Sequence, residues 1–224
     1  KGRIGRRILA RFGSIGSKRL TGPDNAVLYS NTTKARPSAG LSASGLKKAL
    51  GRALGKQLAD SIDVVQSNAE LPTGTVPLSS LGDRIEGMYH PESGKVYLVA
   101  DGVASEERAA WVAWHELWHR GIRSIDGTPG KMPGSVEGNA LNQAINRAGL
   151  NKSVKDLADA IMRDRGMTAS QRRVAVEEAL AELNAADETG DYSAIERRYG
   201  VKVPAGMRSG IRGHIQRFVD AVRG

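Results

Sequence analysis

Two histidines four residues apart enclose a glutamate in the segment His115-Glu116-Leu117-Trp118-His119. In an α-helix, residues four apart lie one above the other on the same face, so both imidazoles can bind one metal ion. This H-E-x-x-H spacing is typical of a zinc site, with nitrogen ligands at about 2.0–2.1 Å from Zn²⁺. Glu116 would reach a metal-activated water rather than the metal. As general base it would accept the proton of that water and pass it to a leaving amine.

Two histidines and a water leave one tetrahedral position to be filled, and the chain has no cysteine to fill it. The best source is the Glu-rich segment 176–183, where Glu178 and Glu182 are four residues apart and share a helix face. We assign Glu178 as the third metal ligand. Glu182 would accept the free N–H of a ligating imidazole and thereby fix its tautomer. Glu177 is the rival ligand, and the alternative to any ligand here is a solvated acidic face.

The other two histidines, His90 and His214, are weaker candidates, because histidines in turns and terminal helices are usually exposed. A helical stripe of three tryptophans, Trp111, Trp114 and Trp118, favours core packing, with a wall of a substrate cleft as the alternative. Transition-state stabilisation requires a further hydrogen-bond donor. The sequence does not rank the candidates, which are Tyr89, His90, Tyr192 and Arg120.

The motif is predicted to lie in a helix that Ser105 caps and that ends at Gly121. Before it, two β-rich runs over 85–89 and 95–100 flank a five-residue Pro/Gly turn and predict a hairpin. The second run is apolar nearly throughout, which predicts a strand inside the sheet. The other expected elements are a helix over 46–58 capped by Ser42 or Ser44, a strand over 62–65, and helices over 153–166, 171–186, 193–199 and 208–222.

The composition, with 40% hydrophobic and 25% charged residues, is that of a globular protein with a core. No apolar run is long enough to span a membrane, and no signal peptide is visible. Most of the net charge of +9 lies at the two ends, which suggests weak contact with nucleic acid. We expect a basic flexible tether over 1–40, a catalytic domain over 41–187 and a basic helical extension over 188–224. The first residue is Lys1, so we expect the chain to be part of a longer protein.

In the H-E-x-x-H motif and the later Glu-rich segment, the sequence resembles gluzincin-type metallopeptidases. It resembles in particular the zincin-like domains of large phage and plasmid polyvalent proteins. The resemblance covers about 40–185, and it rests on the strand 94–101, the helix 108–121 and Glu177-Glu178-Ala179-Leu180-Ala181. It implies an α+β fold in which a small mixed sheet with the hairpin packs on the metal helix, followed by a helical subdomain. The family's Glu-x-x-Ala pattern maps onto 178–181, which favours Glu178 over Glu177 as ligand. It also implies that an extended peptide substrate pairs with a strand of the hairpin.

These observations predict a zinc-dependent metallopeptidase that acts on a peptide or protein, as one module of a mobile-element polyprotein. We expect it in the bacterial cytoplasm, or in a virion and delivered with mobile DNA. One alternative is a nucleic-acid-contacting module of a DNA-injection or conjugation system with a structural or relic metal site. It requires residues 1–20 for salt-dependent DNA binding. Another alternative is a toxin-like effector protease. Its expression in the cytoplasm would arrest growth, and this effect would depend on Glu116. The oligomeric state and the cleavage sequence are not readable from the sequence.

Overall fold

The computed structural model describes residues 28–32, 41–72, 84–90, 93–124, 143–204 and 213. The chain divides into two compact units, residues 1–130 and 131–224, and this division falls inside the expected catalytic domain 41–187. The first unit combines a mixed sheet with helices, and the described part of the second is helical. The α+β class and the small mixed sheet are therefore confirmed. Among the described residues, no helix combines the length and apolar character that crossing a membrane requires.

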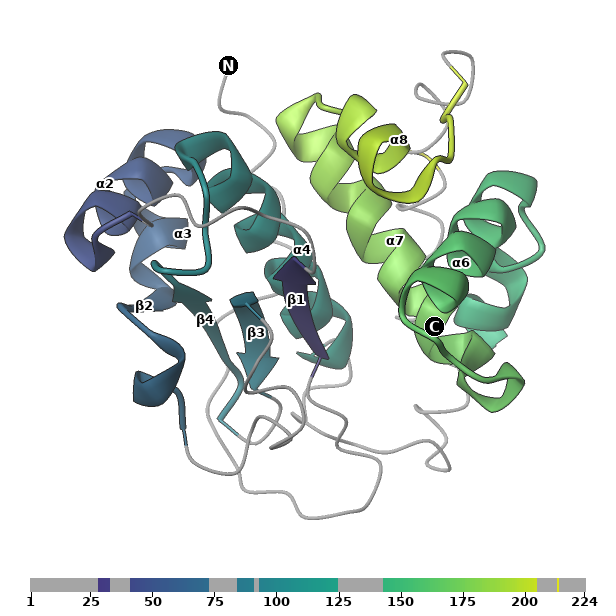
Figure 1. Ribbon diagram of the computed structural model, residues 1–224, viewed down its shortest axis with the longest axis horizontal. Coiled ribbons are helices and arrows are strands. Elements are labelled where there is room, and N and C mark those ends of the chain that lie inside the picture. The colour runs from purple at the N-terminus through teal and green to yellow at the C-terminus, as the bar shows by residue number, and fades with distance from the viewer. Residues whose placement is uncertain are drawn as a thin grey trace. The chain divides into compact units, whose positions relative to one another are not determined.

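The sheet of the first unit has four strands in the order β1-β3-β4-β2 (Figure 1). The predicted hairpin is present as β3 (Arg84–His90) and β4 (Lys95–Val99), which pair antiparallel. On the outer sides, β1 (Leu28–Thr32) runs antiparallel to β3, and β2 (Ile62–Val65) runs parallel to β4. Strand β4 is internal, as its apolar sequence predicts.

Strand β1 lies within the segment 1–40 that the sequence predicts to be a tether, and here the structure differs from the prediction. Its sequence, Leu-Tyr-Ser-Asn-Thr, contains Ser and Asn, which are frequent in loops. A strand depends on a partner as much as on its own residue types, and β3 supplies that partner. The basic residues 1–20 lie outside the described part of the chain.

The predicted helix over 46–58 is divided in two, α2 (Ala43–Leu54) and α3 (Lys56–Asp60). Gly55 separates them with a φ of 84°, a conformation that favours glycine. Ser42 caps α2, as predicted, by accepting a hydrogen bond from the Gly45 amide at 3.1 Å.

The motif helix is α4 (Glu106–Ser124), and it packs on β1, β3 and β4, while α2 packs on α4 and β2 (Figure 1). Ser105 accepts a hydrogen bond from the Arg108 amide at 3.2 Å, which confirms the predicted cap. The helix continues past Gly121, where the sequence predicted its end. The side chain of Ile122 is buried, and this packing outweighs the helix-breaking tendency of one glycine.

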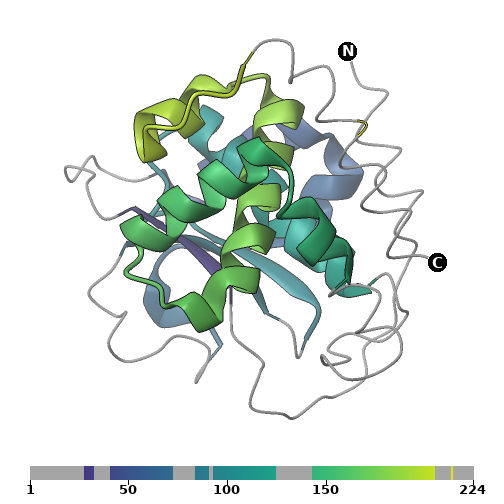
Figure 2. The ribbon, with the colours of Figure 1, turned by 90° about the vertical axis from the view of Figure 1, so that its right-hand side faces the viewer.

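The second unit contains α6 (Lys152–Asp164), the short 3₁₀ helix η3 (Ala169–Gln171), α7 (Arg172–Thr189) and α8 (Ser193–Tyr199). The helices α6, α7 and α8 pack against one another (Figure 2). Thr168 and Gln171 form a capping box that begins η3 just before α7. Gly190 and Gly200 end α7 and α8 in the left-handed conformation. Of the helix expected over 208–222, the structure describes residue 213 alone, which is helical.

Candidate metal centre

The two histidines of the motif face each other on α4. Their Nε2 atoms are 3.2 Å apart, and the ring centroids are separated by 4.9 Å. A tetrahedral zinc ion with nitrogen ligands at about 2.0–2.1 Å holds two of them about 3.3 Å apart. The separation of the two Nε2 atoms in the structure therefore matches that of a zinc-bound pair.

Both rings are buried, with 1% of His115 and none of His119 exposed to solvent. Two neutral imidazole nitrogens with facing lone pairs repel each other at this distance. The pair must therefore share either a proton, as a hydrogen bond, or a cation. A shared proton and a bound cation are both compatible with the 3.2 Å separation of the two nitrogens.

Glu116 is also fully buried, and strand β3 forms the surface beneath it. At Gly87 of β3, an added Cβ would lie 2.6 Å from Cγ1 of Val112 and 3.2 Å from Cγ of Glu116. The absence of a side chain at Gly87 thus lets α4 approach the strand at the turn that carries the motif. No sequence pattern singles out this glycine, because a lone Gly inside a strand is ambiguous.

We expect Gly87→Ala to destabilise the protein by about 1–3 kcal/mol, because its methyl group overlaps Val112. The same methyl group lies too close to Glu116, so any activity that depends on Glu116 should fall as well. Urea unfolding and an activity assay would measure the two effects. Gly51→Ala on α2 is the matched control: nothing lies within 4 Å of its added Cβ, so it should leave stability unchanged or raise it slightly. Equal behaviour of the two variants would show that Gly87 does not position α4.

A buried ion pair fixes the beginning of α4 to the sheet. Arg108 donates hydrogen bonds from Nε and one Nη atom to the two carboxylate oxygens of Glu86, at 2.9 and 2.6 Å. Glu86 is 1% exposed and lies at the irregularity where the register between β1 and β3 shifts. A bulge changes the direction of the side chains next to it. Here Glu86, the residue at the bulge, forms the ion pair with Arg108 at the start of the helix that carries the histidines. This bidentate geometry is specific to arginine.

In the second unit, the acidic side chains of α7 are buried rather than solvated. The exposed fractions are 3% for Glu177, 0% for Glu178 and 1% for Glu182. Burying carboxylates is costly unless they are paired with cations or hydrogen-bond donors. The solvated acidic face considered from the sequence is therefore excluded for these three residues, and their burial calls for partners.

Arg165, which follows α6, is one such partner: its Nη2 atom lies 2.9 Å from Oε2 of Glu178. Burial acts to lower the pKa of Arg165, but Glu178, Tyr199 and Glu182 together outweigh burial, so the pKa is raised above its ordinary value. The guanidinium stays charged and holds one carboxylate oxygen. No sequence pattern marked this residue, because it lies thirteen positions before Glu178 and in another element.

Glu182 has its own neighbours in the second unit. It accepts a hydrogen bond from the Tyr199 hydroxyl at 2.8 Å, and Arg198 lies 3.6 Å away. Burial raises the pKa of Tyr199, and the charge of Glu182 adds to the effect, so the phenol remains a donor. The predicted hydrogen bond from a ligating imidazole to Glu182 stays a prediction.

His115 and His119 lie in the first unit and Glu178 in the second, and these three residues are the ligand group that the sequence predicts. Glu177, the rival ligand, is not in this group. Two imidazoles and one carboxylate form a donor set that suits Zn²⁺ and leaves a fourth position open for water.

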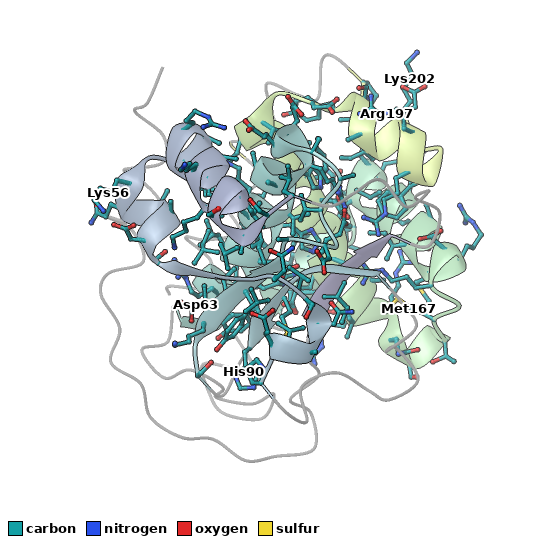
Figure 3. The ribbon with its side chains drawn as sticks, turned by 60° about the vertical axis from the view of Figure 1, so that its left-hand side comes forward. Lys56, Asp63, His90, Met167, Arg197 and Lys202 are labelled. Carbon is teal, nitrogen blue, oxygen red and sulfur yellow. The ribbon has the colours of Figure 1, made fainter. Side chains whose placement is uncertain are left out.

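The remaining candidates have other surroundings. His90 lies where β3 ends, with Nδ1 2.8 Å from the Ser93 hydroxyl (Figure 3). Arg120 donates to the backbone oxygen of Ser61 at 3.1 Å, and Tyr192 donates to Asp187 at 2.9 Å. The three tryptophans of the stripe are buried, which supports core packing. His214 lies outside the described residues.

No protein-family model matches the chain, and comparison with curated proteins and with solved structures finds no match. The functional argument therefore rests on the residues and on their geometry.

Proposed function

We propose that the chain is a zinc-dependent metallopeptidase of the zincin type. The observation that carries the proposal is the buried pair His115 and His119 on α4, with Nε2 atoms 3.2 Å apart and Glu116 between them in the sequence. Glu178 is the proposed third ligand, and its complete burial and its match to the Glu-x-x-Ala pattern of the resemblance support this assignment. When bound, a zinc ion polarises a carbonyl group and lowers the pKa of a water molecule to about 7.

Glu116 is the proposed general base. Its carboxylate accepts the proton of the attacking water and returns it to the nitrogen of the leaving amine, which balances the hydrolysis of a peptide bond. Its Cγ would lie 3.2 Å from a Cβ added at Gly87, so the side chain packs closely against β3. A base held in one position loses little entropy when the reaction occurs.

Two arginines pair with buried acids of the proposed site. Arg165 would hold the carboxylate of Glu178, and Arg108 would keep the start of α4 in place through Glu86. Such supporting contacts orient ligands and tune metal affinity. The resemblance to domains of phage and plasmid polyvalent proteins supports a role as one module of a mobile-element polyprotein, with a peptide or protein as substrate.

Metal content tests the proposal directly. The full chain, purified without chelator, should contain about one zinc per chain, because two imidazoles and a carboxylate saturate all but one position. We expect His119→Ala to lose most of this zinc, since one imidazole alone cannot retain it. His90→Ala is the control and should keep the zinc, because His90 contacts Ser93 and is not in the ligand group. Elemental analysis that finds no zinc in the unmodified chain would remove the basis of the proposal.

A further inference from the structure

Two buried carboxylates on α7 are paired with cations from two other elements of the second unit. Glu178 and Glu182 are one helical turn apart on α7, and both are buried. Neighbouring carboxylates disfavour each other's charge unless cations compensate them. Arg165 at the end of α6 lies 2.9 Å from Glu178, and Arg198 of α8 lies 3.6 Å from Glu182. Each acid therefore has its own arginine.

Tyr199, the last residue of α8, connects the two ion pairs. Its hydroxyl donates a hydrogen bond to Oε1 of Glu182 at 2.8 Å, and the same oxygen faces Arg198. A phenol hydroxyl that donates its proton keeps lone pairs that can accept from another donor. Against burial, which lowers it, the pKa of Arg165 is raised by Glu178, Tyr199 and Glu182. Tyr199 and Glu182 therefore act on the same guanidinium that holds Glu178.

Arg165 depends on such further contacts because the backbone fixes only the base of its side chain. Its N–H donates to the carbonyl of Ile161 at 3.0 Å at the end of α6, and Gly166 follows with a φ of 61°. The long side chain beyond this point is 22% exposed. Holding a long charged side chain in one geometry costs conformational entropy, so a single ion pair is a weak restraint.

We propose that Tyr199 is a positioning residue for the metal centre. Its hydroxyl, together with Glu182, fixes the guanidinium of Arg165, and Arg165 in turn fixes the carboxylate of Glu178. The inference rests on the proposed function, in which Glu178 is the third ligand. It also brings α8 into the functional part of the chain, although the sequence predicted a catalytic domain that ends at residue 187. Outer contacts of this kind orient a ligand and tune metal affinity.

The test measures the zinc affinity of the full chain by competition with a chromogenic chelator. Tyr199→Phe keeps the ring and removes the hydroxyl, so zinc affinity should fall about tenfold, the lower end of the range for supporting residues. Tyr192→Phe is the matched control and should bind zinc like the parent. The Tyr192 hydroxyl donates to Asp187 at 2.9 Å, so this variant loses an equivalent hydrogen bond that does not involve Arg165.

Two further measurements separate positioning from a general loss of stability. Thermal unfolding in excess chelator should show similar decreases in Tm for Tyr199→Phe and Tyr192→Phe, because each variant loses one hydrogen bond to a carboxylate. The visible absorption spectrum of the Co²⁺-loaded chain reports the coordination geometry of the metal. It should change in Tyr199→Phe and stay like that of the parent in Tyr192→Phe.

A double-mutant cycle tests whether Tyr199 acts through Arg165. Arg165→Lys keeps a cation beside Glu178 but lacks the planar group of several donors that Tyr199 and Glu178 can hold together. In the Arg165→Lys background, Tyr199→Phe should therefore change zinc affinity by less than about twofold, because two residues on one route are not additive.

A parent chain that binds zinc, with a Tyr199→Phe variant of unchanged affinity, would overturn the assignment and leave the proposed function intact. Equal losses of affinity in Tyr199→Phe and Tyr192→Phe would overturn it too, because the effect would then be one of stability. The same holds for a full loss in the Arg165→Lys background, since Tyr199 would then not act through Arg165. A parent chain without zinc would instead contradict the proposed function, and the assignment with it.

Discussion

Replacing Glu116 by glutamine should lower the rate of peptide hydrolysis by roughly 10²–10⁴-fold, the usual contribution of a positioned general base. Glutamine has nearly the same shape and can keep the packing against Gly87, but its amide cannot accept a proton at neutral pH. The zinc content should stay near one per chain, because Glu116 is not in the ligand group. Turnover of a mixed peptide library and elemental analysis on the same sample would measure both effects.

The matched control is Glu107→Gln, an exposed position in the first turn of the same helix. It removes an equal charge from α4 at a distance of two helical turns from the motif, so hydrolysis and zinc content should both be unchanged. If Glu116→Gln kept full activity with zinc bound, the base would have to be another residue. If it lost zinc, Glu116 would be a ligand, and its assignment as base would be wrong.

Much of the first unit could be predicted because local signals agree there. The hairpin of β3 and β4, strand β2 and the Ser105 cap of α4 each follow from short-range patterns, and the structure contains all of them. The facing of His115 and His119 follows from the helix geometry alone once the helix is established. These features require no knowledge of distant parts of the chain.

Other features depend on contacts that no local pattern encodes. Strand β1 forms because β3 offers an edge, although residues 28–32 lie in a segment with the composition of a loop. The role of Gly87 appears only when Val112 and Glu116 are placed against it. The pairing of Arg165 with Glu178 joins two elements of the second unit, and a sequence in which charges are common gives no reason to connect them.

The sequence offers two adjacent residues, Glu177 and Glu178, as the third metal ligand. A pair of substitutions decides between them. Glu178→Gln should reduce zinc affinity by more than about 100-fold, because loss of a ligand exceeds the 10–100-fold typical of a supporting residue. Glu177→Gln, also at a buried position on α7, should change it little, since Glu177 is not in the ligand group. Competition with a chromogenic chelator would measure both affinities.

Loss of charge at Glu178 also leaves Arg165 without its ion-pair partner, so the variant is expected to be less stable even without metal. Thermal unfolding in excess chelator measures the stability lost with the Arg165 ion pair. The rise in Tm on adding zinc measures the stability gained from metal binding. If Glu178 is a ligand, zinc should raise the Tm of the parent and of Glu177→Gln by similar amounts, and that of Glu178→Gln much less. A full zinc-dependent rise in Glu178→Gln would limit Glu178 to pairing with Arg165 and remove it from the metal site.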